Sequence, residues 1–186
     1  DDDRATMQRR LLKRCQMSTE TAASGSQHPM MTLRAVLAEI GWDARSEEQD
    51  NSIFVDLDAE DVPVSYAHAA ISDELEQFVF YITLAHVPTV DQRDQCALLV
   101  SHINHDIMLG GFDLDFDTGR LCFKNGISFH GSELRVQDIR NVILDSMKAV
   151  ETYVDMIVAV INGQSSQDAL RQWRAAQPNL RYRRSE

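Results

Sequence analysis

The sequence predicts an α+β fold, in which an antiparallel sheet of about five strands carries helices packed on one of its faces. Two patterns predict it: some segments repeat apolar residues at helical spacing, and others alternate apolar with polar residues between turn-forming residues. The chain has 186 residues, a length that suits one domain with tails. We therefore expect a disordered tail over residues 1–28, a single domain over 29–176 and a basic tail over 177–186.

The first predicted elements are a helix and three strands. The helix covers Met30–Ile40, because its apolar residues follow the i, i+3, i+4, i+7 rule and Gly41 can end it. Apolar and polar residues alternate over Ile53–Leu57 and again over Val64–His68, as they do in strands. Phe78–Leu84 is rich in β-branched and aromatic residues, which is typical of a central strand. Together these segments indicate an antiparallel meander.

The second predicted helix follows a capping-box pattern, with Thr89 as the N-cap and Gln92 three residues later. Its apolar stripe runs to about Met108, and Gly110-Gly111 ends the helix. The residues that we expect on its buried face are Cys96, Leu99, Val100 and Ile103.

A hairpin is predicted next. Its first strand, Phe112–Phe116, places apolar side chains on one face and carboxylates on the other. Thr118-Gly119 forms the turn, and Leu121–Lys124 is the returning strand. Asn125-Gly126 is a typical turn dipeptide, so we expect a second turn there.

A long helix and a short one complete the domain. Ser132 is the expected cap of a helix over Glu133–Ile161. A straight helix of that length would measure about 44 Å at roughly 1.5 Å per residue, so a bend or a break is expected. Asn162-Gly163 ends it, and Ser165 opens a last short helix.

The long helix is apolar on more than one side between residues 147 and 161. Such a helix is either central in its own domain or shared with a neighbour, and we favour a shared face. This predicts a homodimer, or a complex with another polypeptide, through a protein interface at Val150, Val154, Ile157, Val158 and Ile161. Short edge strands near residues 51–70 also offer backbone groups for strand addition by another chain.

Charge and hydropathy exclude some classes of function. The 18 basic and 29 acidic residues give a net charge of −11, which disfavours binding to nucleic acid. No stretch is long and apolar enough to span a membrane, and no apolar signal core is present near the first residue. We therefore expect a cytoplasmic location, with no nucleic-acid partner and no membrane span.

Two groups of residues could carry chemistry, although we expect neither to do so. His102 and His105 lie three residues apart, and so on one helical face that could ligate zinc or copper. Asp113, Asp115 and Asp117 start like a calcium loop, but its later ligand positions are not filled. Both groups are expected to be solvated polar faces, and no catalytic residue, cofactor or metal is predicted. The alternative is a metal-dependent enzyme or sensor that uses these five residues.

Four segments together resemble the YbjN-domain family, whose members are described as proposed bacterial sensory transduction regulators. They are the strand Phe78–Leu84, an Asn-containing helix (Ile103-Asn104), the GGFDLDFDTGRLCFK stretch from Gly110, and a final helix that closes in Gly163, Ser165 and Ala169. The resemblance implies an α+β fold similar to that of the small type III secretion chaperones, often paired as a dimer, and it carries over no catalytic residue. We therefore expect a non-enzymatic protein-binding module, chaperone-like or regulatory, that holds a segment of another polypeptide through an apolar surface.

Overall fold

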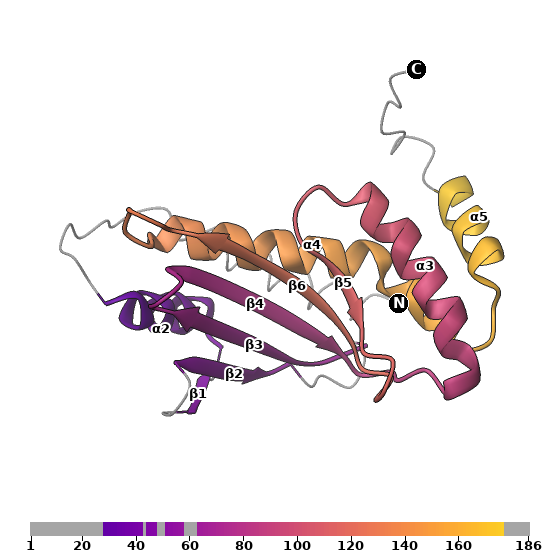
Figure 1. Cartoon of the computed structure of the whole chain (residues 1–186), viewed down its shortest axis with the longest axis horizontal. Coiled ribbons are helices and arrows are strands. Elements are labelled where there is room, and N and C mark those ends of the chain that lie inside the picture. The colour runs from indigo at the N-terminus through magenta and orange to yellow at the C-terminus, as the bar shows by residue number, and fades with distance from the viewer. Residues whose placement is uncertain (1–27, 43, 48–50, 58–62, 177–186) are drawn as a thin grey trace, which may run out of the picture.

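Figure 1 shows the computed structural model, which describes residues 28–42, 44–47, 51–57 and 63–176. The predicted tails, apart from His28, therefore lie outside the described residues. The helices and strands, in chain order, are α2 (Pro29–Ile40), β1 (Ala44–Glu47), β2 (Ser52–Asp56), β3 (Val64–Ser72), β4 (Gln77–Leu84), α3 (Arg93–Asp106), β5 (Gly111–Leu114), β6 (Leu121–Ser128), α4 (Val136–Ile161) and α5 (Ser166–Ala176).

The strands form one antiparallel sheet. Within the described residues it has six strands in the order β1-β2-β3-β4-β6-β5, so the first four form the predicted meander. β1 is not predicted from the sequence, because Ala44–Glu47 contains no β-branched or aromatic residue. It pairs with β2 and is the outer strand at this end of the sheet, so the edge strand near residues 51–70 is β1, and β2 is an inner strand.

The hydrophobic core lies between one face of the sheet and the helices, as predicted. α4 runs lengthwise behind β4 and β6, and α2 packs against α4 at one end (Figure 1). Phe78, Phe80 and Ile82 of β4 are buried on this face, and Trp42 stacks on Phe80 with ring centroids 6.2 Å apart. α3 and α5 pack together at the β5 end of the sheet (Figure 1).

The opposite face of the sheet carries a row of side chains that crosses four strands. Phe54, His68, Tyr81 and Lys124 are direct cross-strand neighbours. The rings of Phe54 and His68 stack with centroids 4.3 Å apart, those of His68 and Tyr81 are 5.6 Å apart, and the Lys124 ammonium lies 5.5 Å from the Tyr81 ring centroid. This row stabilises the register of the central strands.

The helices follow the predicted periodicity closely. α2 ends at Gly41, whose φ of 78° is the left-handed conformation expected of a C-cap glycine. In front of α3, the Thr89 N–H donates to Gln92 Oε1 at 2.9 Å, as in a capping box, and opens a short 3₁₀ turn before the α-helix. α3 ends at Asp106, two residues before the predicted end. The four residues predicted on its inner face are all buried: Cys96, Leu99, Val100 and Ile103.

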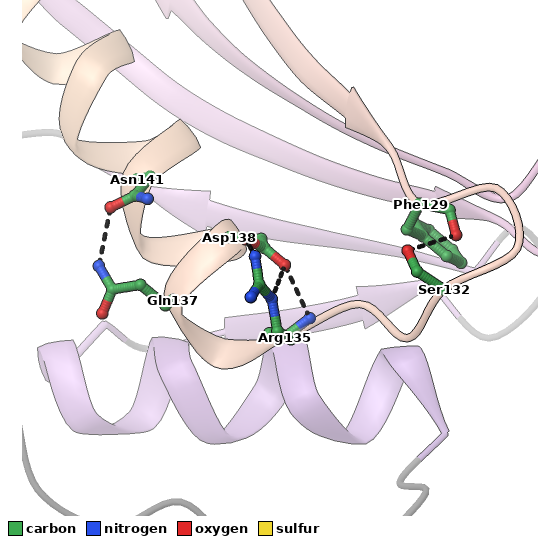
Figure 2. A network of polar contacts seen from close by, with 6 residues as sticks. All are labelled: Phe129, Ser132, Arg135, Gln137, Asp138 and Asn141. Atoms are coloured by element: carbon green, nitrogen blue, oxygen red, sulfur yellow. Dashed lines mark hydrogen bonds and ion pairs between the residues drawn. The ribbon is translucent and has the colours of Figure 1, made fainter.

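The chain before α4 is built differently from the prediction (Figure 2). Ser132 does not cap the helix; its hydroxyl donates to the Phe129 carbonyl at 2.9 Å in a separate turn. The N-cap is Arg135, whose backbone N–H and guanidinium both donate to the Asp138 carboxylate. α4 then runs for 26 residues to Ile161 without a break, which leaves the alternative of a bend open, and Asn162 is its C-cap.

The predicted second turn at Asn125-Gly126 is also wrong. Both residues lie inside β6, where Asn125 faces Phe80 and Gly126 faces Val79 of β4. Pairing along the full length of β4 overrides the local turn preference of this dipeptide. Among the described residues, no helix is both long and apolar enough to cross a membrane.

Candidate functional site

The two strands of the hairpin differ in length, and this difference leaves part of a sheet edge open. β5 pairs over Gly111–Leu114 with Lys124–Leu121 of β6. β6 continues to Ser128, and on its other side Gln77–Thr83 of β4 pairs with Cys122–Ser128. Within the described residues, the segment 125–128 of β6 therefore has a strand neighbour on one side only.

Gly110 is the reason that β5 starts no earlier. Its φ is +75°, and a Cβ at this position would lie 2.7 Å from the Lys124 carbonyl oxygen and 2.8 Å from Cζ of Phe123. The chain therefore crosses close to β6 here and turns away from it, which only glycine allows. The turn separates the paired half of β6 from its open half.

The outer edge of β5 is closed by a side chain of α3. The Asn104 amide donates to the Phe112 carbonyl at 2.9 Å, and its Oδ1 accepts from the Phe112 N–H at 2.8 Å. The side chain thus makes the two hydrogen bonds that a further strand would make at this residue. The sheet ends at β5, and the open edge is confined to the second half of β6.

The direction of the backbone groups in β6 follows from one hydrogen bond at its end. The Phe129 N–H donates to the Glu76 carbonyl at 2.8 Å, on the β4 side. Because successive residues of a strand point their backbone groups to opposite edges, those of Gly126 and Ser128 face the open side. The Gly126 N–H donates to Asn125 Oδ1 at 2.8 Å, so a side chain of the same strand occupies this donor.

An open groove of about 560 Å³ lies along this edge, a volume within the range of roughly 300–1,000 Å³ that is typical of ligand sites. Leu109 is 65% exposed and Ile127 is 36% exposed, although both are large and apolar. The groove is lined by Gln77, Phe78, Val79, Leu109, Gly110, Gly111, Phe112, Asp113, Lys124, Asn125, Gly126, Ile127 and Ser128.

One carboxylate lines the groove, and a second lies just outside its lining. Asp113 is exposed and lines the end next to β5. At the other end, Glu76 precedes the first lining residue of β4, and its carboxylate accepts from the Gly131 N–H at 3.1 Å and contacts His130 Nδ1 at 3.1 Å. The basic residue in the lining, Lys124, extends toward the Tyr81 ring.

The five α4 residues predicted as a protein interface lie largely inside the protomer. Ile157 is fully buried, Val154 is 2% exposed, and Val150 and Ile161 are also buried, whereas Val158 is half-buried. Contacts of α4 with the sheet, α3 and α5 account for their apolar character without a second chain. An interface at these five residues stays a prediction.

The candidate metal ligands are not gathered by the fold. His102 and His105 are exposed on α3. The Asp115 carboxylate is used within its own turn, where the Thr118 hydroxyl donates to it at 2.6 Å and, with two backbone N–H groups, lowers the pKa of Asp115. Among residues 28–42, 44–47, 51–57 and 63–176, no three His, Cys, Asp or Glu side chains come together as metal ligands.

The predicted strand row of three aspartates is also shorter than expected. β5 ends at Leu114, so only Asp113 lies in the strand, while Asp115 and Asp117 belong to the turn. Phe116, predicted on the apolar face of the strand, is 51% exposed there. The carboxylate of Asp115 ends the strand because it binds the backbone N–H groups of the two residues that would continue it or begin the turn, Asp117 and Thr118.

The two cysteines in the described part are poor nucleophiles. Burial raises the pKa of the Cys96 thiol, which lies in the core as predicted. Burial, together with the nearby Asp113 carboxylate, raises the pKa of Cys122. Both thiols are therefore protonated near neutral pH.

No protein-family model matches the chain, and the curated proteins contain no match. Among solved structures it is similar to YbjN from E. coli, described as a proposed transcription regulator, with a TM-score of 0.51 and 16% identity over 77% of this chain and 92% of YbjN. The chain has a YbjN-like fold. It is also similar to a chain of the ExsC–ExsE complex, with a TM-score of 0.49 and 15% identity over 69% of this chain and 92% of that one. The predicted resemblance and the predicted fold class are thus confirmed.

Sequence analysis did not find the groove. The groove contains two glycine-containing dipeptides, Gly110-Gly111 and Asn125-Gly126, and the sequence predicts an end of an element at each. In the structure, β5 begins beside β6 at Gly110-Gly111, and from Asn125-Gly126 onward β6 pairs with β4 only. Alternation of apolar and polar residues runs over 112–117 and does not end at Leu114, so it did not reveal the difference in length.

Proposed function

We propose that this chain is a non-enzymatic protein-binding module, chaperone-like or regulatory, which holds a segment of another polypeptide in the groove beside β6. The observation that carries this proposal is the exposure of Leu109 and Ile127 beside a sheet edge that has no strand neighbour in the described part. Large apolar side chains next to backbone groups without a strand partner are a combination that polypeptides recognise well.

The ionisable side chains in the groove lining support binding rather than catalysis. The groove lining contains one carboxylate and one ammonium group, Asp113 and Lys124, and both are exposed. An active-site acid or base is usually held in a buried setting that shifts its pKa. The proposal therefore combines a YbjN-like fold with a groove in which a partner segment can bind.

Site-specific photo-crosslinking tests the proposal. A photo-reactive amino acid is placed at Leu109, and in a matched variant at Met31, which is 62% exposed on α2. After irradiation in cells or in cell extract, we expect covalent adducts with a defined polypeptide at Leu109 and not at Met31. A second variant, Ile127→Asp, is expected to lower the yield at Leu109 several-fold.

Equal adduct patterns at Leu109 and Met31 would contradict the proposal, because they would show random contact with the surface. The same holds if no polypeptide adduct forms at Leu109. The predicted homodimer is measured in the same preparation by light scattering, and it stays a prediction until then.

A further inference from the structure

We infer that the groove takes its partner as an added β-strand, which pairs with the backbone of Gly126 and Ser128 and is flanked by a basic residue. This inference rests on the proposed function and adds to it the conformation and the charge of the bound segment.

The backbone of β6 is prepared for this pairing. Gly126 and Ser128 each direct one N–H and one carbonyl to the open side. Both residues are exposed, and Gly126 carries no side chain that would shield these groups. Over the four residues 125–128 the open edge is about 13 Å long, at roughly 3.3 Å per residue, which matches a segment of about four residues.

The Asn125 side chain makes a hydrogen bond that an incoming strand could make instead. Its Oδ1 accepts from the Gly126 N–H at 2.8 Å, although Asn125 is only 7% exposed and lies opposite the buried Phe80. The bond satisfies a donor that would otherwise attract other chains. An incoming carbonyl can replace the side-chain oxygen at this donor without a change in the β4–β6 pairing.

Side chains of the added strand would alternate between the two faces of the sheet. On one face they meet Ile127, and on the other they meet Val79, which is half-exposed beside Gly126, while Leu109 lines the same groove. A segment with apolar or β-branched residues therefore fits both faces.

Charge distinguishes a basic partner from a second copy of this chain. The chain carries a net charge of −11, which favours a basic segment over a second copy as the occupant of this edge. Asp113 lines the β5 end of the groove, where a basic residue that flanks a short strand would meet it, and the ammonium group in the lining, Lys124, is directed to the Tyr81 ring. Complementary charges of this kind favour a different, basic-flanked polypeptide as the occupant.

The test uses the full chain and a synthetic peptide, Lys-Val-Thr-Val-Thr-Val-Lys. Binding is followed by the amide resonances of Gly126 and Ser128, together with their hydrogen exchange. We expect both amides to shift and to become protected at up to millimolar peptide. We also expect affinity to fall several-fold when salt rises from about 50 mM to about 500 mM.

Two changes remove backbone pairing and leave the side chains in place. N-methylation of alternate residues of the peptide, on the edge that faces β6, is expected to weaken binding by at least about tenfold. In the protein, Ser128→Pro removes a donor on the open side only, a position where proline is tolerated in a strand, and Ser128→Ala is its control. Proline is expected to weaken binding about as much as N-methylation does, whereas alanine has little effect.

The inference is wrong if the peptide shifts no amide of β6, if it shifts residues on another face, or if N-methylation leaves the affinity unchanged. It is also wrong if the Gly126 and Ser128 amides shift with protein concentration alone, which would indicate a second copy as the occupant. A positive crosslink at Leu109 with any of these results would leave the proposed function standing and remove the strand-addition mode.

Discussion

Asn104 shows how one side chain can end a β-sheet. It lies on α3 and binds both backbone groups of Phe112, where it replaces a whole neighbouring strand. Because Phe112 is 3% exposed, these backbone groups have no ready access to water if the amide is removed. The asparagine therefore has a structural reason to be there, independent of any ligand.

We expect Asn104→Ala to lower the free energy of unfolding by roughly 1–3 kcal/mol, because two buried backbone groups lose their partners. Urea unfolding measures this loss. Asn141→Ala is the control, since Asn141 only accepts from Gln137 on the exposed surface of α4 (Figure 2), and its loss should be about 0.5 kcal/mol or less. Equal losses in the two variants would show that the Asn104 bonds do not support β5.

Asp138 makes the stability of the helix start depend on pH. The hydrogen bonds from Arg135 lower the pKa of this carboxyl below its ordinary value of 3.8. The folded state therefore binds the proton less readily than the unfolded state does. The stability that Asp138 contributes is present above about pH 4, and it is lost as the pH falls through the lowered folded pKa.

We expect Asp138→Asn to destabilise the protein near pH 7 and to have little further effect near pH 2. Chemical unfolding at both pH values measures the difference, with Asp145→Asn, an exposed position on the same helix, as the control. A destabilisation of the same size at both pH values would mean that the charge of Asp138 has no part in the effect.

At the scale of elements, periodic patterns predicted most of what the structure contains. α2, α3, α4 and α5 were all predicted, because three- and four-residue spacing of apolar side chains needs only local sequence. The predictions failed where pairing with a strand distant in sequence determines the local conformation. Asn125-Gly126 would turn in isolation, but pairing with Phe80 and Val79 keeps it extended, and β1 forms only because β2 lies beside it.

The α4 helix is where the predicted interface and the observed core differ most. We expect Val154→Asp and Ile157→Asp to abolish folding, because each places a carboxylate at a site that is at most 2% exposed, at a cost of several kcal/mol. Circular dichroism and light scattering measure folding and mass. Val158→Asp, at a half-buried position, is expected to keep the fold with a smaller loss of stability.

If Val154→Asp and Ile157→Asp instead stay folded and change only the mass of the particle, the α4 face is a subunit interface and its burial in one protomer is not what stabilises it. If both variants keep fold and mass, neither role holds.

At the scale of the whole molecule, the fold class could be predicted from sequence but the candidate site could not. The fold class depends on the kinds of elements and their order, which local patterns report. The groove forms because β6 extends four residues past its pairing with β5. At that point the chain turns away from β6 at Gly110. Such a difference arises from pairing between strands, and no single segment of the sequence contains it.

The choice between a binding module and a metal-dependent protein is also made at this scale. His102 and His105 have exposed side chains, and Asp115 already accepts three hydrogen bonds in its turn. Two exposed imidazoles without a third ligand hold zinc weakly compared with a closed site. We therefore expect less than about 0.1 zinc or calcium per chain by elemental analysis of protein purified without chelator, and no change in Tm with EDTA.

His102→Ala combined with His105→Ala is expected to leave Tm within about 2 °C of the parent, since exposed substitutions usually change stability little. Stoichiometric metal that disappears in this double variant would instead identify α3 as a metal site and favour the sensor or enzyme hypothesis over the groove.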